Sequence, residues 1–373
     1  MASLHLFLII INLAILTKKM DNLNKSDGAT KNNADVSVRM KVFLQSQFFK
    51  ILGGQSVGGG LVSTLENQRK MLGFLNIPFT EIDTGDWDIV QINIPWPKSV
   101  RLAKRAKKEG KKVIMWSHVT IEDLEKSIAL LKIGFLRNYV KKYLKNAFSV
   151  ADMVLCPSQY TKNLLIAYGL PEEKLTVQSN AVDIKKFYFD QNLRDEYRKK
   201  YKLTGMVVGN VGLVIYRKGI DTFLEVAKEF KNYTFIWFGK MFNKALAQGV
   251  KTETPTNVSF TGYVDNIVAS FNALDIFFFP SYEENQGMVI LEAAAVGLPI
   301  LVREIPTYEG WLVHEVNCLK AKNKSEFETY LKMLLEDENL RNRLKTGALE
   351  LAKNESIETQ AQHLKKVYDK LLN

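Results

Sequence analysis

Short apolar runs alternate with longer amphipathic or polar stretches along most of the chain, a pattern typical of parallel sheets covered by helices. In the first half the apolar runs lie at residues 40–46, 88–94, 112–116, 151–157 and 174–178. In the second half they lie at residues 205–211, 233–238, 258–261, 275–280 and 299–302. Helical patterns fill the intervals, so we expect an α/β protein with two successive strand and helix units.

The clearest unit spans residues 275–302. Its apolar run at 275–280 predicts a strand buried on both faces, and the polar segment 281–287 predicts a loop. Residues 288–296 read as a helix that ends at Gly297. The loop should open at the carboxyl edge of a parallel sheet, where doubly wound folds bind ligands.

This loop offers a candidate anion site with two carboxylates beside it. The backbone amides of Gly287, Met288 and Val289 begin the predicted helix and would point at an anion. Glu284 lies in the loop, and Glu292 could accept hydrogen bonds from vicinal hydroxyls, as an acidic residue does from ribose. Two glutamates at this spacing are common by chance, and a solvated helix face is the alternative for Glu292.

Length and composition suit a two-domain protein without a metal centre. The 373 residues are enough for two domains of about 150 to 190 residues each. Cys156 and Cys318 show no CxxC spacing, which argues against a disulfide framework or a zinc site and for a reducing compartment. The four histidines form no HExxH pattern, so no protein-bound metal is expected.

The first 39 residues are expected to be a non-catalytic extension. The apolar run from Leu4 to Leu16 would give a helix of about 20 Å, short of the roughly 30 Å hydrocarbon core. No basic residue within the chain precedes this run and no small-residue cleavage site follows it, so a secretory signal is poorly supported. The first strand should begin at Met40.

A glycine cluster, Gly53-Gly54 and Gly58-Gly59-Gly60, follows the first strand and leads into a helix. Glycines allow the backbone to approach a phosphate or sugar closely, so Gly59 is a candidate donor contact. A flexible loop is the alternative. The cluster does not match the GxGxxG pattern of a plain NAD site.

Positive charge is concentrated in one region. The chain has a net charge of +11, and residues 98–145 hold fourteen Lys or Arg against four acids, a net of +10. Residues 132–148 are also amphipathic, as in a helix lying in a membrane interface, and no DNA- or RNA-reading motif accompanies the charge. We expect an anionic membrane surface as partner, although charge runs often form only solvated helix faces. The candidate membrane-binding residues are Lys98, Arg101, Lys104, Arg105, Lys107, Lys108, Arg137, Lys141, Lys142 and Lys145.

Two further segments place polar residues where strands end. His118 follows the strand at 112–116, and Arg217 and Lys218 precede a helix that opens at Gly219. Paired cations before a helix suit a pyrophosphate. A packing role for His118 and a plain surface pair for the two cations are the alternatives.

The spacing of several motifs resembles a known enzyme family. Pro280-Ser281, Glu284, Gly287, Glu292-Ala293 and Gly297-Leu298-Pro299 match the nucleotide-sugar signature of the retaining glycosyltransferases of the GT-B fold, family 4, in which seven residues separate two glutamates. The string from His118 to Asp123 is similar to a His-x-Thr-x-Glu-Asp string of bacterial 1,2-diacylglycerol 3-glucosyltransferases (monoglucosyldiacylglycerol synthases). The chain departs from the family at Ala181, where a glycine is usual, and at Leu213, which replaces an arginine and leaves Arg217 as a substitute.

The resemblance implies two Rossmann-like domains facing across a cleft, with residues 40–183 binding the acceptor and 184–355 the nucleotide sugar. Residues 356–373 would form a helix returning to the first domain. In such enzymes the diphosphate leaves from the front face of the sugar, where Arg217, Lys218 and the amides after Gly287 would meet its charge. Glu284 would hold sugar hydroxyls, Glu292 the ribose, and His118 the sugar ring.

The implied reaction is transfer of a hexose, with UDP-glucose as the expected donor, to 1,2-diacylglycerol. The enzyme would be peripheral on the cytoplasmic side of a bacterial cell membrane, with no covalently bound cofactor. A family 4 enzyme acting on a cell-wall or capsular saccharide remains an alternative, and a non-enzymatic basic membrane binder is a more distant one. The sequence leaves open the sugar, the nucleotide, the acceptor and the oligomeric state.

Overall fold

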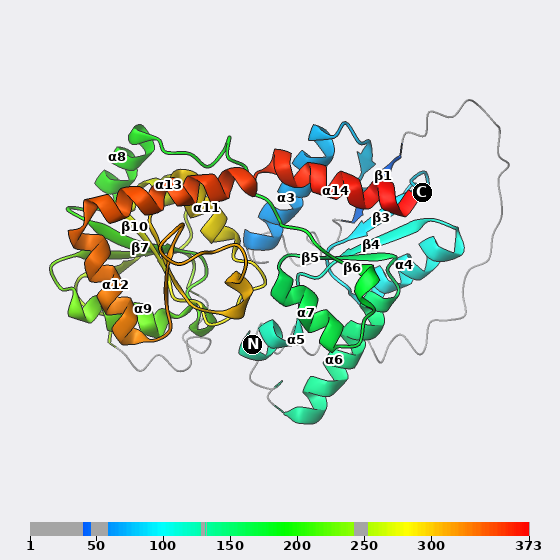
Figure 1. Cartoon of the computed structure of the whole chain (residues 1–373), viewed down its shortest axis with the longest axis horizontal. Coiled ribbons are helices and arrows are strands. Elements are labelled where there is room, and N and C mark those ends of the chain that lie inside the picture. Colours follow the sequence, from blue (N-terminus) through cyan, green and yellow to red (C-terminus); the bar gives the residue numbers. More distant parts are fainter. Residues whose placement is uncertain (1–39, 46–58, 128–130, 132, 242–252, 373) are drawn as a thin grey trace.

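The structure, a computed structural model, describes residues 40–45, 59–127, 131, 133–241 and 253–372. The predicted extension 1–39, the glycine loop up to Gly58, and Lys132 lie outside these residues. The described strands form two six-stranded sheets in which every pairing is parallel. Figure 1 shows the sheets side by side, with helices on both faces of each.

The first sheet has the strand order β2-β1-β3-β4-β5-β6. Its strands are β1 (Val42–Gln45), β2 (Phe79–Thr80), β3 (Ile89–Ile92), β4 (Lys112–Trp116), β5 (Met153–Cys156) and β6 (Leu175–Val177). One face packs against α4 (Pro97–Lys108), α6 (Gly134–Ser149) and α7 (Gln159–Ala167). The other face packs against α3 (Gly59–Phe74) and α14 (Ile357–Leu372), while the short α5 (Ile121–Ser127) follows β4.

The second sheet has the strand order β12-β11-β10-β7-β8-β9. Its strands are β7 (Val207–Val211), β8 (Thr234–Phe238), β9 (Val258–Phe260), β10 (Ile276–Phe279), β11 (Ile300–Arg303) and β12 (Leu319–Ala321). On one face lie α8 (Gln191–Lys200), α10 (Ile267–Asn272), α11 (Met288–Val296) and α13 (Glu338–Asn354). On the other lie α9 (Ile220–Glu229) and α12 (Lys324–Glu336).

The central strand and helix pair of the second sheet matches its sequence pattern closely. All four residues of β10 are buried, as expected for a strand that is covered on both faces. Helix α11 spans the predicted residues and lies between Gly287 (φ 93°) and Gly297 (φ 81°). Both flanking positions are left-handed, a conformation that glycine adopts without strain.

The chain crosses between the sheets twice, at neighbouring points. The amide of Val182 donates to the carbonyl of Glu355 (2.9 Å), and the amide of Ile357 donates to the carbonyl of Val182 (3.1 Å). Helix α14 then runs back over the first sheet, and in Figure 1 it continues the line of α13 from one side of the molecule to the other. The predicted α/β architecture with a returning terminal helix is confirmed. The domain boundaries after residues 183 and 355 stay a prediction.

Several predicted limits were too generous, and two strands were missed. The interval between the predicted strands at 88–94 and 112–116 is helical only as far as Lys108, because Gly110 takes a left-handed conformation (φ 75°). β2 and β12 have two and three residues, too few for an alternating pattern to stand out. No helix among the described residues is long and apolar enough to cross a membrane.

Candidate active site

The loop 281–287 lies at the carboxyl end of β10, where the sequence predicted the site. The amide of Tyr282 donates to the carbonyl of Arg217 (2.8 Å), and the Thr307 hydroxyl donates to the carbonyl of Glu284 (2.7 Å). The loop is therefore held from both neighbouring connections of the second sheet.

The same loop also contacts the first half of the chain. Asn285 Nδ2 donates to the carbonyl of His118 (2.9 Å), and Gln286 Nε2 donates to the hydroxyl of Ser179 (2.7 Å). The amide of Asn180 donates to Gln286 Oε1 (2.9 Å). These bonds bring His118 and the glutamate loop to one junction between the sheets.

Glu284 is buried in an ion pair with Lys218. Lys218 Nζ lies 2.5 Å from Glu284 Oε1, the Ser281 hydroxyl lies 2.6 Å from the same oxygen, and Arg217 Nη1 lies 3.7 Å away. Burial by itself raises the pKa of Glu284, but the two cations and the hydroxyl outweigh burial and hold this pKa below its usual value. Glu284 is therefore an ionised acceptor for hydroxyl groups near neutral pH.

Arg217 links the two halves of the chain by pairing with Asp123, a residue that was not among the predicted site residues. Its Nη1 donates to the carbonyl of Glu283 (2.7 Å) and forms an ion pair with Asp123 Oδ1 (3.2 Å). Burial lowers the pKa of Arg217, but Asp123 and Glu284 more than offset this effect and keep the side chain charged. Asp123 is the last residue of the family-like string that begins at His118, and this string was the sequence signal from which a role in the site could have been predicted.

Glu292 is a buried carboxylate with an unpaired oxygen. It is 2% exposed, and its Oε2 has no hydrogen-bond partner among the described residues. Burial raises its pKa to about 7, with a small opposing effect of Lys186 and a small added effect of Glu66. This excludes the solvated helix face, and a buried carboxyl with a raised pKa is a typical functional group.

The start of α11 supplies backbone donors next to these carboxylates. Gly287, Met288 and Val289 occupy the first turn, in which amides have no acceptor within the helix. A side chain at Gly287 would meet Ile290 Cδ1 at 3.0 Å. Gly59, the other backbone candidate for donor binding, is the first residue of α3. The negative charge of Glu66 on the same helix slightly raises the pKa of Glu292.

His118 is a neutral imidazole held by two neighbours. Its side chain is 9% exposed, and burial lowers its pKa to about 3. The ring stacks on Trp116 with centroids 5.3 Å apart, and Nε2 lies 3.1 Å from Asn93 Oδ1. His118 can therefore hydrogen bond to a ligand at neutral pH without carrying a charge.

The described residues contain no group of three or more His, Cys, Asp or Glu arranged to hold a metal ion. Both Cys156 and Cys318 are buried thiols.

The candidate membrane residues of α4 divide into paired and unpaired cations. Arg105 pairs with Asp83, and Lys107 pairs with Asp152. The remaining candidates of this helix are exposed and form no ion pair with any described residue: Lys98, Arg101, Lys104 and Lys108.

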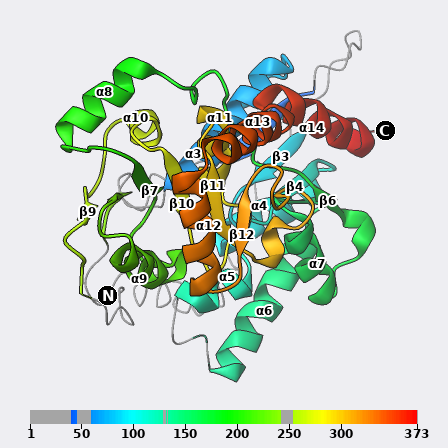
Figure 2. The same ribbon diagram turned by 60° about the vertical axis from the view of Figure 1, so that its left-hand side comes forward.

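Helix α6 is partly buried and partly an apolar outer surface. Val140, Leu144 and Ala147 pack into the core. Ile133, just before the helix, is 43% exposed, and Phe135 and Tyr139 are 72% and 54% exposed. Figure 2 shows this helix at the outer edge of the first half.

The charged residues of α6 differ in their surroundings. Arg137 pairs with Glu125 (3.0 Å) and Glu122 (3.2 Å), and Lys141 lies over the Tyr168 ring. Lys142 is exposed and Lys145 is half-buried, and neither forms an ion pair with a described residue.

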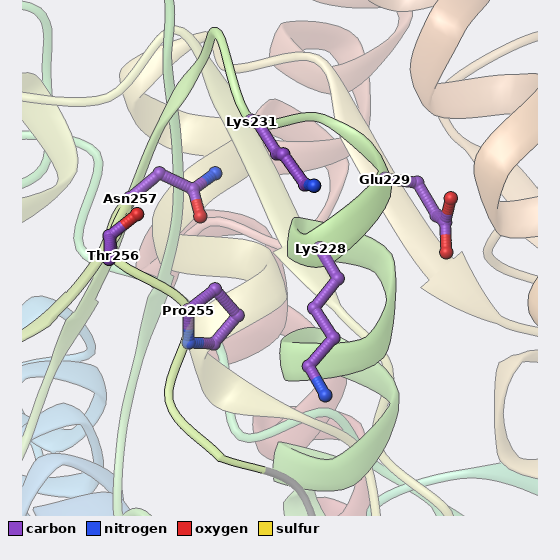
Figure 3. A pocket seen from close by; sticks show the side chains of 6 residues that line it. All are labelled: Lys228, Glu229, Lys231, Pro255, Thr256 and Asn257. Atoms are coloured by element: carbon purple, nitrogen blue, oxygen red, sulfur yellow. The ribbon is translucent and has the colours of Figure 1, made fainter.

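A surface hollow lies at the opposite edge of the second sheet (Figure 3). It is lined by Lys228, Glu229, Lys231, Pro255, Thr256 and Asn257, which precede β8 and β9 or end α9. Asn257 Nδ2 donates to the carbonyls of Ala227, Phe230 and Tyr233, so its amide has a structural role. The hollow does not belong to the site at the carboxyl edge.

The protein families and relatives that this chain resembles are glycosyltransferases. Residues 46–186 match the model for Glycosyltransferase Family 4, and residues 193–350 match the model for Glycosyl transferases group 1. The processive diacylglycerol alpha-glucosyltransferase of Acholeplasma laidlawii is 31% identical over 89% of this chain and 99% of the relative. The alpha-galactosylglucosyldiacylglycerol synthase of Streptococcus pneumoniae is 29% identical over 70% of this chain and 71% of that protein.

Solved structures share the architecture at low sequence identity. Anabaena Alr3699/HepE in complex with UDP-glucose matches 89% of this chain and all of its own, with a TM-score of 0.71 at 16% identity. WaaG, a glycosyltransferase involved in lipopolysaccharide biosynthesis, matches 88% of this chain and 99% of its own, with a TM-score of 0.62 at 14% identity. These likenesses concern the fold.

Proposed function

Because this chain belongs to family 4 of the GT-B glycosyltransferases and is a hexosyltransferase, we propose that it transfers glucose from UDP-glucose to the 3-hydroxyl of 1,2-diacylglycerol with retention of configuration. The observation that carries this proposal is the junction that joins the Glu284 loop, the start of α11 and His118. Both relatives reported above are named for diacylglycerol glycolipid synthesis.

The donor would lie across the carboxyl edge of the second sheet. Lys218, Arg217 and the amides of the first turn of α11 form the positive side of the site and would bind the diphosphate. Glu292 would accept hydrogen bonds from the ribose hydroxyls, which would give its unpaired Oε2 a partner. Glu284 would accept hydrogen bonds from the hexose.

In the reaction, a bond forms between the acceptor oxygen and the anomeric carbon while the bond from that carbon to the diphosphate oxygen breaks. The acceptor proton would pass to the leaving phosphate oxygen on the same face of the sugar, which retains the α configuration. Charge developing on that oxygen would be stabilised by Lys218, Arg217 and the helix amides, an electrostatic effect that is usually the largest. His118 is neutral near pH 7 because burial lowers its pKa to about 3, and it would orient the sugar ring by a hydrogen bond.

A panel of nucleotide sugars with diacylglycerol and with water-soluble saccharide acceptors tests this proposal. We expect one product, a glucosyldiacylglycerol formed from UDP-glucose, with the small anomeric coupling constant of an α linkage in NMR. A saccharide product would favour the cell-wall or capsule alternative. A β-linked lipid would contradict retention.

The acceptor would reach residues 40–183 from the cytoplasmic side of the membrane, with the protein attached peripherally. Lys98, Arg101, Lys104 and Lys108 are exposed on α4, and the apolar side chains of Ile133, Phe135 and Tyr139 lie on or next to α6 of the same half. The α6 side chain Tyr143 donates to the carbonyl of Pro95, just before α4, so the two helices are neighbours. Together they would form an electrostatic and apolar docking surface.

Liposome binding tests this surface. At about 1 kcal/mol for each basic residue, changing Lys98, Arg101, Lys104 and Lys108 to Ser should weaken binding to anionic liposomes about 10³-fold at low salt. The matched control changes exposed cations elsewhere to Ser, namely Lys199, Lys228, Lys231 and Arg343. Equal losses in both variants would show that only net charge matters, and no loss in the first would remove the docking role of α4.

A further inference from the structure

A continuous chain of buried side-chain hydrogen bonds connects His118 to the C-terminal helix. His118 Nε2 meets Asn93 Oδ1 (3.1 Å), and Asn93 and Gln68 pair through both ends of their amides (2.6 and 3.0 Å). Gln91 Nε2 donates to Gln68 Oε1 (3.0 Å), and the Tyr368 hydroxyl donates to Gln91 Oε1 (2.6 Å). All five side chains are buried, on or next to α3, β3, β4 and α14.

Stability alone does not explain this network. Buried amides lose their hydration, and apolar side chains of similar size are usually at least as stabilising in such a position. Gln91 lies between Val90 and Ile92 in a fully buried strand, where an apolar residue would fit the pattern. Every link is satisfied, which is the condition under which a buried polar network fixes one arrangement of its members.

The orientation of each amide in this network is coupled to that of the next, although Asn93 Nδ2 also donates back to Gln68 Oε1. Because Tyr368 donates to Gln91 Oε1, the amide of Gln91 presents its Nε2 to Gln68 Oε1. Gln68 in turn presents its Nε2 to Asn93 Oδ1. A carbonyl oxygen only accepts, so the ring nitrogen of His118 facing Asn93 carries the proton, and Nδ1 is left as the acceptor.

We infer that Tyr368, acting through Gln91, Gln68 and Asn93, is a positioning residue that sets the tautomer of His118. Without its hydroxyl the Gln91 amide has no donor to orient it, and the amides behind Asn93 can reverse. Nε2 would then face an amide nitrogen, and the proton would move to Nδ1. This inference rests on the proposed role of His118, and it makes the docking of α14 on the first sheet a requirement for a complete site.

The direct test is the nitrogen NMR spectrum of the full chain labelled with ¹⁵N-histidine. The sequence has four histidines, and the signal missing from a His118→Ala spectrum assigns His118. In the wild type we expect the Nε2-protonated tautomer, and in Tyr368→Phe a mixture of the two tautomers. Turnover should fall about five- to tenfold with the KM for the donor little changed, the loss expected when one ordering hydrogen bond is removed.

Tyr197→Phe is the matched control. Tyr197 is also buried, and its hydroxyl also has a hydrogen bond, in which it accepts from the amide of Asn266 (3.3 Å), but it packs against the second sheet. This variant should keep the wild-type tautomer and turnover. Equal loss of turnover in both variants, or an unchanged tautomer in Tyr368→Phe, would overturn the inference.

A double variant separates positioning from folding. Gln91→Leu with Tyr368→Phe leaves neither polar group buried without a partner, so it should unfold no more easily than the wild type. It should nevertheless show the mixed tautomer and the reduced turnover. A double variant with normal turnover and a mixed tautomer would show that the tautomer has no role in catalysis. Near-normal turnover in His118→Ala would instead refute the proposed role of His118, whatever the spectra show.

Discussion

The raised pKa of Glu292 makes its ionised carboxylate unfavourable for folding and tests its proposed role in donor binding. Its carboxyl binds a proton more tightly in the folded protein, with a pKa of about 7, than at the ordinary value of 4.5. The shift corresponds to about 3 kcal/mol. This loss of stability is complete above pH 7, shrinks as the pH falls from 7 to 4.5, and vanishes below.

Glu292→Gln replaces the carboxyl by a neutral group of the same shape. At pH 8 the variant should therefore have a free energy of unfolding up to about 3 kcal/mol above that of the wild type. At pH 5 the carboxyl is almost fully protonated in the folded protein but still mostly ionised in the unfolded chain, so the difference should shrink to about 1 kcal/mol. Urea unfolding at the two pH values measures both differences. An equal difference at pH 5 and pH 8, or a less stable variant at pH 8, would refute the burial argument.

Donor affinity should depend on pH in the opposite direction to stability, so it should be highest where the carboxylate of Glu292 is ionised. If ribose hydroxyls donate to the ionised carboxylate of Glu292, each pH unit below 7 weakens binding of UDP-glucose by roughly tenfold. The wild type should therefore approach the affinity of Glu292→Gln near pH 5, while the variant itself shows little pH dependence. Calorimetry with UDP-glucose is suitable because its diphosphate does not titrate in this range. A wild-type affinity that is constant from pH 8 to pH 5 would remove Glu292 from the ribose site.

Three further predictions concern the ion pair of the loop and two residues with left-handed backbone conformations. Glu284→Ala and Lys218→Ala should each lower turnover about 10²-fold or more, because the ion pair between them lies where charge would develop in the proposed reaction; wild-type rates at limiting donor would contradict this. Gly219→Ala should destabilise the protein by more than about 2 kcal/mol in urea unfolding, since φ is 77° and the added Cβ would lie 2.2 Å from the carbonyl oxygen of Pro280. Ala181→Gly should instead stabilise by up to roughly 1 kcal/mol, since this buried alanine has φ 60°; a loss of stability would show that the turn is not strained.

Local patterns determined the elements that the sequence predicted well. The run of apolar residues in β10 and the glycines at both ends of α11 each specify their element within a few residues. The motif at 280–299 also predicted that Glu284 lies in a loop and Glu292 in a helix, and both predictions are correct. The anion site beside them stays a prediction. Local sequence patterns were sufficient to predict this unit because its strand, loop and helix are consecutive in the chain.

The polar network could not be predicted because its members are far apart in sequence. Gln91 and Tyr368 are separated by 277 residues and meet only after α14 has returned to the first sheet. The one local signal was the presence of Gln91 and Asn93 in an otherwise apolar strand. The pairing of Arg217 with Asp123 was hidden for the same reason, since it joins the two halves.

The return of α14 also affects how the protein is made. One face of the first sheet carries Ile114, Trp116 and Leu155 and packs against α14. While the ribosome synthesises the second half, this face is not yet covered by α14. A nascent chain in this state displays an apolar surface of the kind that chaperones bind and that leads to aggregation. Folding of the first half is therefore completed only after translation of the second, and a truncation before Ile357 should produce an insoluble product rather than an isolated acceptor domain.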